Sequence, residues 1–241
     1  MTRLLAQLVV VLLTGLALKY FYSTANPNQL RWILAPTAFL VELFSERTFE
    51  FESHMGYLSN DQTFLIAGSC AGVNFLITAF LMLTLRKLWV DRNRNTSWLF
   101  ILSAAVIAYA ATLVANTVRI ATALRMQQMS LENSWLSGNQ LHRLEGIFVY
   151  FGFLLLLYLL TERLINQPAT VENGPNVLRQ AFFPLLIYYA TMLGIPLANG
   201  AYHQGSDFWQ HALFVLLTPL LLVLPLVTFR FHKCRMRQVS G

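Results

Sequence analysis

Six long runs of apolar residues, each bounded by polar or charged positions, dominate the pattern of the chain. They cover residues 4–22, 64–85, 98–118, 144–161, 180–198 and 209–229. Each run approaches the roughly 20 residues that a helix needs to cross a bilayer. A seventh run, Trp32 to Phe44, is shorter and contains Pro36 and Glu42, so we expect a short interfacial or re-entrant helix there. The pattern predicts an all-α, polytopic membrane helix bundle of about six to eight transmembrane helices.

Composition agrees with this pattern and predicts one membrane domain over residues 1–241. Hydrophobic residues make up 56% of the chain and charged residues only 12%, whereas a water-soluble domain of this size needs a more charged surface. A turn-rich connection at 167–175 separates a section at about 60–165, which holds the residues of chemical interest, from a two-span section at about 178–230. The net charge of +6 comes from basic residues beside apolar runs, so it does not indicate nucleic-acid binding.

The basic residues also predict the orientation of the chain. They cluster after the second run, at 86–94, and in the tail, at 230–237. Loops rich in lysine and arginine face the cytoplasm. Six spans with both termini inside satisfy this rule, and they leave three segments on the outer side: 23–63, 119–143 and 199–208.

The chain has two cysteines, Cys70 and Cys234, which this orientation places on opposite sides of the membrane. A disulfide between them is therefore excluded. Cys70, in Gly68-Ser69-Cys70-Ala71-Gly72, is expected about six residues inside the second span, roughly 9 Å below its outer end. Gly68 and Gly72 would then share one helix face. A small buried apolar residue is the alternative interpretation of Cys70.

Arg119 follows Asn116 by one helical turn at the outer end of the third run. Lysine and arginine avoid that side, which favours a role for Arg119 in stabilising a thiolate or an oxyanion. Snorkelling of the side chain to the lipid headgroups is the alternative interpretation. His142 stands at the outer entry of the fourth run, with Glu145 three residues on. Glu145 can orient the imidazole if the helix already includes His142, although an ordinary interfacial histidine is the alternative.

These residues together supply the parts of Cys–His chemistry. A thiol nucleophile, a base that takes its proton and a cation for the tetrahedral oxyanion come from three runs and map to one leaflet. His203, Asp207 and His211 form a weaker set, because glycines interrupt the helix that would align them. We therefore expect no metal and no cofactor.

The motifs Cys-Ala-Gly at 70–72 and Asn-x-x-Arg-Ile at 116–120, followed by a histidine at the start of the next run, resemble the signature of exosortases and archaeosortases. The likeness covers about 60–165, and the brevity of the chain resembles a short branch such as exosortase K. It implies Cys70 as nucleophile, Arg119 as partner of the thiolate or oxyanion and His142 as acid and base, with Asn116 in support. The 32–44 segment and the low span count depart from longer members.

The resemblance also implies a substrate and a location. Exosortases are cysteine peptidases or transpeptidases that recognise a C-terminal sorting signal on exported proteins: a short motif, one transmembrane helix and a basic tail. The implied location is the bacterial inner membrane, with the site facing the periplasm, so the partners are such proteins and the lipid bilayer.

A non-enzymatic membrane protein, either a small transporter or an assembly scaffold, is the alternative from another class. A transporter is expected to show inverted repeats or polar residues near mid-membrane. This chain has its polar candidates at the predicted outer interface. Replacing Cys70 with alanine separates the two classes, because only the enzyme loses precursor processing.

Overall fold

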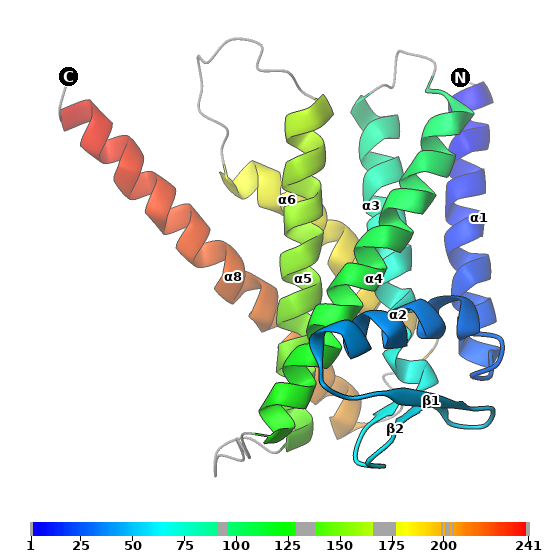
Figure 1. The fold of residues 1–241 in the computed structure, drawn as a ribbon. Helices are drawn as coiled ribbons and strands as arrows, with labels where there is room; N and C mark the ends of the chain where they lie inside the picture. Colours follow the sequence, from blue (N-terminus) through cyan, green and yellow to red (C-terminus); the bar gives the residue numbers. More distant parts are fainter. Residues whose placement is uncertain are drawn as a thin grey trace. The chain divides into compact units, whose positions relative to one another are not determined.

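The computed structural model describes residues 2–90, 96–128, 138–165, 177–198, 200, 203 and 205–239. Helices account for most of the described chain (Figure 1): α1 (Thr2–Thr24), α2 (Arg31–Phe44), α3 (Val73–Val90), α4 (Trp98–Gln128), α5 (Gly138–Ile165), α6 (Val177–Tyr189), α7 (Ile195–Ala198) and α8 (Ser206–Val239). Short strands β1 (Phe49–Glu52), β2 (Gly56–Ser59) and β3 (Leu65–Ile66) form one antiparallel sheet. Some parts of the chain lie outside the described residues: the connection at 167–175, Arg92 and Arg94. The same holds for the side chains of Asp207 and of residues 230–237, which include Cys234.

The all-α polytopic membrane bundle predicted from the sequence is confirmed. Within the part of the chain that the structure describes, five stretches are long and apolar enough to cross a membrane: Arg3–Thr24, Gly68–Val90, Trp98–Gln127, Gln140–Leu164 and Ala181–Ala198. They correspond to the first five predicted runs. The sixth run falls within α8, whose described apolar part is the shorter stretch Phe208–Leu224.

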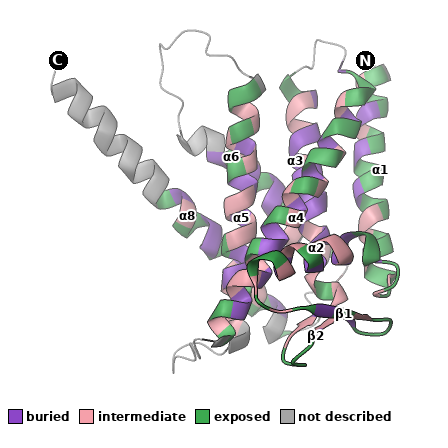
Figure 2. Ribbon diagram, in the orientation of Figure 1, coloured by how far each residue is buried: buried purple, intermediate pink, exposed green. Residues whose placement is uncertain are grey.

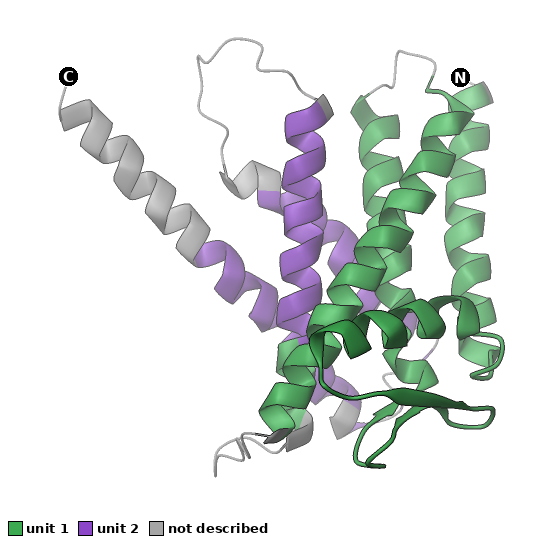
Figure 3. Cartoon of the chain, in the orientation of Figure 1, with its two compact units in different colours: residues 1–145 green, residues 146–241 purple. Residues whose placement is uncertain are grey.

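The chain divides into two compact units, residues 1–145 and 146–241 (Figure 3). In the first unit α3 is the central helix and packs against both α1 and α4. Most of its residues are buried (Figure 2), and Phe75, Ile77 and Met82 are almost completely enclosed. Because α3 is fixed on two sides, the chain segment that leads into it is held in place as well.

The short apolar segment at 32–44 is a separate helix, as its length and composition predicted. This helix, α2, has 14 residues, too few for a span. It crosses α4 (Figure 1) and packs on it. The Tyr109 hydroxyl donates to the Trp32 carbonyl at 2.6 Å, and the two rings stack at 5.8 Å. These contacts attach α2 to the third span.

The three-stranded sheet was not predicted from the sequence. Its first two strands lie in the 23–63 segment and its third strand follows directly after that segment. Its signal is the alternation Phe49-Glu50-Phe51-Glu52, which is the period of a half-buried strand. The turn into β2 depends on Gly56, which has a φ of +123°, a conformation that side chains disfavour. An added Cβ at Gly56 would collide with the Ile66 carbonyl oxygen. A run of four residues was too short to be recognised without its partner strands.

Asp61 stabilises the loop that follows β2, and we expect this contribution to depend on pH. Hydrogen bonds from Ser59 (2.6 Å) and Thr63, with Arg47 at 3.2 Å, hold the pKa of the Asp61 carboxyl below its ordinary value. A lowered folded-state pKa means that the stabilisation is present above the unfolded pKa of about 3.9 and is lost as the pH falls through the folded-state pKa. Hydrogen exchange of residues 45–66, measured from pH 7 to pH 3 and corrected for intrinsic rates, should show falling protection at the acid end.

Asp61→Asn is the matched control for that titration. It keeps the shape of the side chain and removes the ionisable group. Its exchange should therefore be faster at neutral pH and independent of pH. Equal acid sensitivity in both proteins would assign the effect to another group.

The second unit contains the remainder of α5 with α6, α7 and α8. Ring contacts join α5 to α6, with Phe151 at 5.4 Å from Tyr188 and Tyr158 at 6.0 Å from Phe183. The Tyr189 hydroxyl donates to the Leu216 carbonyl at 2.8 Å and ties α6 to α8. A π-helical stretch, Ala190–Gly194, connects α6 with α7.

Candidate functional site

Cys70 lies in a tight turn at the entrance to the second span. Gly68–Cys70 is one turn of 3-10 helix, closed by the Cys70 amide donating to the Ala67 carbonyl at 2.8 Å. Gly72 takes a φ of +70°, a left-handed conformation that interrupts a right-handed helix. The helix α3 therefore begins at Val73. The expectation that Cys70 lies inside the helix, with Gly68 and Gly72 on one face, is wrong for this reason.

Asn116 holds the cysteine turn against α4. It is fully buried, and its side-chain amide donates to the Cys70 carbonyl at 2.5 Å. A carbonyl in a tight turn has no helical partner, so this hydrogen bond satisfies it and fixes the turn at the same time. Asn116 thus joins two segments that are 46 residues apart in sequence.

Arg119, one turn after Asn116 on α4, contacts His142 near the start of α5. Nη2 of Arg119 lies 3.3 Å from Nε2 of His142. Because a guanidinium only donates, Nε2 must accept in this contact, and the imidazole proton is placed on Nδ1. Nδ1 lies 3.4 Å from a carboxylate oxygen of Glu145. In the neutral form of the imidazole, this geometry therefore places the basic nitrogen facing Arg119.

Glu145 is the most enclosed ionisable group of this cluster. Its side chain is 6% exposed, against 48% for that of His142. Among the described residues, neither Glu145 oxygen accepts a hydrogen bond of good geometry. The imidazole of His142 is therefore the partner that the structure gives this carboxylate. A buried carboxylate beside Nδ1 stabilises the imidazolium that forms when Nε2 takes up a proton.

The carboxyl end of α1 adds Tyr22, which the sequence analysis missed. Its hydroxyl donates to the Gly68 carbonyl at 3.3 Å, and it lies close enough to Cys70 and Arg119 for a charge on either side chain to act on it. Lys19, one turn earlier, bonds the Asn74 side chain at 2.7 Å and lies 5.7 Å from the centre of the Tyr22 ring. A tyrosine at the end of an apolar run resembles any interfacial aromatic residue, so only the fold reveals this contact.

All the residues predicted for the site belong to the first unit. Arg119, His142 and Glu145 form a direct chain of contacts, Asn116 binds the backbone of Cys70, and Tyr22 is within electrostatic reach of Cys70 and Arg119. Cys70 itself is partly exposed and is a free thiol. Within the described residues no group of three potential metal ligands occurs.

The fold and these contacts together define a class: a multi-pass membrane protein whose α4 bonds the cysteine turn through Asn116 and contacts His142 through Arg119, with the buried Glu145 next to His142. A family model described as transmembrane exosortase matches residues 1–159 of the chain, which includes all of these residues. The chain belongs to the transmembrane exosortase family, and so to a class of membrane protein-sorting enzymes. Searches of curated proteins and of solved structures gave no match.

Proposed function

We propose that this protein is a membrane-embedded cysteine peptidase or transpeptidase that cleaves a C-terminal sorting signal. Cys70 is the nucleophile, His142 is the general acid and base, and Arg119 is the cation that stabilises the developing negative charge. The observation that carries the proposal is a chain of contacts from Glu145 through His142 to Arg119. Arg119 lies on α4, and Asn116 of the same helix binds the Cys70 turn. Family membership supports the same class of chemistry.

The first half of the reaction forms a thioester. His142 Nε2 takes the thiol proton, and the Cys70 sulfur attacks the scissile carbonyl carbon. The carbon–sulfur bond forms while the carbonyl π electrons move to oxygen, and Arg119 stabilises the resulting oxyanion. When this intermediate collapses, the carbon–nitrogen bond breaks and His142 gives its proton to the leaving amine.

The second half regenerates the enzyme. A water molecule or an amine, made nucleophilic by proton transfer to His142, attacks the thioester carbonyl. The carbon–sulfur bond breaks, and the sulfur recovers the proton from the imidazolium. Water gives hydrolysis and an amine gives transfer, so one site performs both reactions.

The contact between Arg119 and His142 has a consequence for this cycle. Nε2 cannot accept from Arg119 and from the Cys70 thiol with the same lone pair, so the guanidinium must release it when the base acts. Once Nε2 is protonated, the imidazolium and guanidinium repel, which drives Arg119 towards the oxyanion. Glu145 stays at Nδ1 and stabilises the imidazolium throughout.

The substrate in this proposal is an exported protein that ends in a short motif, one transmembrane helix and a basic tail. If the basic tail stays in the cytoplasm, the motif emerges at the outer interface. The Cys70 turn at the end of the second span lies on that side in the predicted orientation. The proposed location is thus the bacterial inner membrane, with the site facing the periplasm.

Trapping the acyl-enzyme tests the proposal directly. The purified protein, reconstituted in lipid, is incubated with a precursor of this form from the same genome, and neutral hydroxylamine is added. Hydroxylamine converts a thioester to a hydroxamate, so the released substrate should carry a hydroxamate at its new carboxyl end. Cleavage without hydroxamate would argue against a thioester, and absence of cleavage with every such precursor would overturn the peptidase assignment.

Replacing Asn116 should weaken the activity by misplacing the nucleophile. Asn116→Leu keeps the volume and removes the donor, which leaves the Cys70 carbonyl unsatisfied at a cost of about 1–3 kcal/mol. We expect processing to fall by about 10–100-fold, because small displacements of a reacting atom are costly. The measurement is the initial rate of precursor cleavage, with thermal unfolding recorded in parallel.

Asn74→Leu is the matched control. It removes an amide that contacts Lys19 rather than the cysteine turn, so it should alter stability more than the cleavage rate. Equal rate losses in the two variants would indicate general destabilisation in place of a role for Asn116 in positioning Cys70.

A further inference from the structure

An open groove runs along the first unit between α2 and α4, and its chemistry is not used by the proposed reaction. It has a volume of about 440 Å³, which is within the size range of ligand sites. Leu40 and Phe44 of α2 form one wall, and Val114, Val118 and Ala121 of α4 form the other. Arg125 lines the same groove. The groove therefore combines a long apolar surface with one cation.

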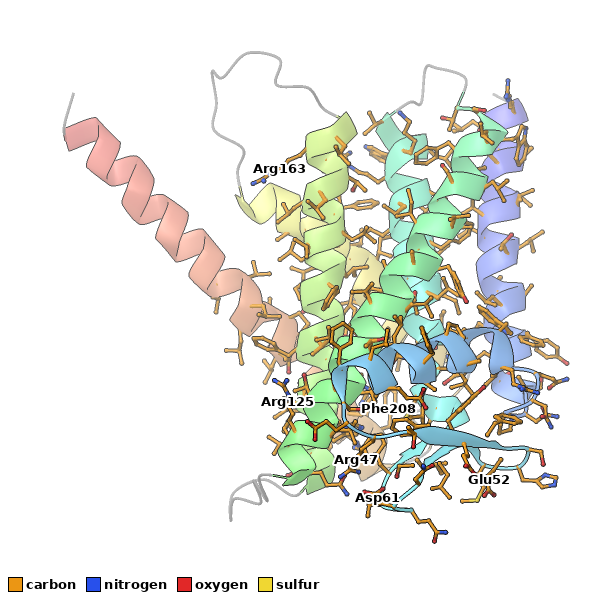
Figure 4. All side chains as sticks on the ribbon, viewed as in Figure 1. Arg47, Glu52, Asp61, Arg125, Arg163 and Phe208 are labelled. Carbon is orange, nitrogen blue, oxygen red and sulfur yellow. The ribbon has the colours of Figure 1, made fainter. Side chains whose placement is uncertain are left out.

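Arg125 stands at the end of the third span, where a membrane headgroup would lie. It is exposed, in the last turn of α4, and Figure 4 shows its side chain projecting from the lower part of that helix. No ion pair to another described residue occupies it. An arginine at this depth attracts anionic headgroups.

The hydroxyl groups of the groove argue against an extended peptide as its occupant. Thr117 and Thr122 both line it, but each donates to a carbonyl of its own helix, at 2.7 Å and 2.8 Å. An extended peptide would bury backbone N–H and C=O groups there with few partners, which costs several kcal/mol per group in an apolar setting. A hydrocarbon chain has no such groups to satisfy.

We propose that this groove is a binding site for an anionic phospholipid, with its phosphate at Arg125 and one acyl chain between α2 and α4. The apolar walls match the chain and the guanidinium matches the phosphate. The site would also fasten α2, which the Trp32–Tyr109 contact attaches at its other end. The inference is independent of the proposed reaction, because it uses none of the residues assigned to catalysis.

Photo-crosslinking tests this site without any measurement of activity. The full-length protein is reconstituted with phosphatidylglycerol that carries a diazirine in one acyl chain, and labelled peptides are mapped by mass spectrometry. Labels should concentrate at residues 40–44 and 114–125. Arg125→Gln should reduce them about fivefold, the effect of one arginine at a membrane surface, and Ala121→Trp should block the groove.

Two matched variants serve as controls. Arg163→Gln removes an arginine from the last turn of α5, and Val106→Trp introduces the same side chain at a position of α4 that is 62% exposed and outside the groove. Both should leave labelling of the groove unchanged.

Three outcomes would overturn the proposal. Labels spread evenly around α4, including residues near Val106, would show ordinary lipid contact. Undiminished labelling of the groove in Arg125→Gln would show that Arg125 does not bind the lipid headgroup. Loss of lipid labels on adding a synthetic peptide with a motif, an apolar helix and a basic tail would assign the groove to the peptide instead.

Discussion

Cys70→Ala should abolish precursor processing, lowering the rate by about 10³-fold or more, because no other group of the site can form the acyl-enzyme. Because the Cys70 side chain is partly exposed, truncation to alanine should cost less than about 1 kcal/mol of stability. Loss of activity with unchanged thermal unfolding would therefore assign the thiol a chemical role. The measurement is the fraction of tagged precursor that is cleaved over time in membranes or in reconstituted lipid.

Cys234→Ala is the matched control for that experiment, because Cys234 is the remaining cysteine of the chain and belongs to the tail. It should process precursor at the normal rate. Cys70→Ser should behave like the alanine variant, since a serine hydroxyl is a far weaker nucleophile without a site built for it. Unchanged processing by Cys70→Ala, with a defect in assembly or transport, would favour the scaffold or transporter over the enzyme.

His142→Ala should have the second-largest effect, a loss of about 10²–10⁴-fold in the cleavage rate, which is the usual contribution of a positioned acid and base. The side chain of His142 is 48% exposed, so added imidazole can reach the space that the variant leaves. Partial rescue by imidazole, rising with its concentration, would identify proton transfer as the lost function. A purely structural role would not respond to a small base in solution.

The control for His142 is His54→Ala. His54 lies in the exposed turn between β1 and β2 and should be dispensable. The double variant Cys70→Ala/His142→Ala should be no slower than Cys70→Ala alone, since residues that act as a unit do not add. If the two losses multiplied, the thiol and the imidazole would be acting in separate steps.

The spans and the order of the site residues could be predicted from the sequence because each depends on a local pattern. A long apolar run predicts a membrane helix wherever it occurs, and five of the predicted runs correspond to described stretches that are long and apolar enough to cross a membrane. The spacing of Asn116 and Arg119 puts both on one side of α4, and that of His142 and Glu145 brings imidazole and carboxylate to 3.4 Å. The motif at 70–72 completed a likeness that the family match over residues 1–159 bears out.

Other features needed the tertiary structure. The left-handed Gly72 places Cys70 in a turn before α3, whereas the apolar run alone suggested a position inside the helix. The short strands of the outer segment gain their stability from one another, so no single run of four residues is sufficient to predict them. The contacts of Tyr22 with the cysteine turn depend on how α1 packs against α3.

The sequence by itself predicted that this chain crosses the membrane several times, because hydropathy acts over neighbouring residues. It also placed a thiol, a guanidinium and an imidazole on three successive apolar runs. The tertiary structure decided which groups meet: the amide of Asn116 with the Cys70 carbonyl, the guanidinium of Arg119 with His142, and the hydroxyl of Tyr22 with Gly68. These contacts join residues that are 46, 23 and 46 positions apart. Residues so far apart in sequence come into contact only when whole helices pack together, and a local sequence pattern does not predict that packing.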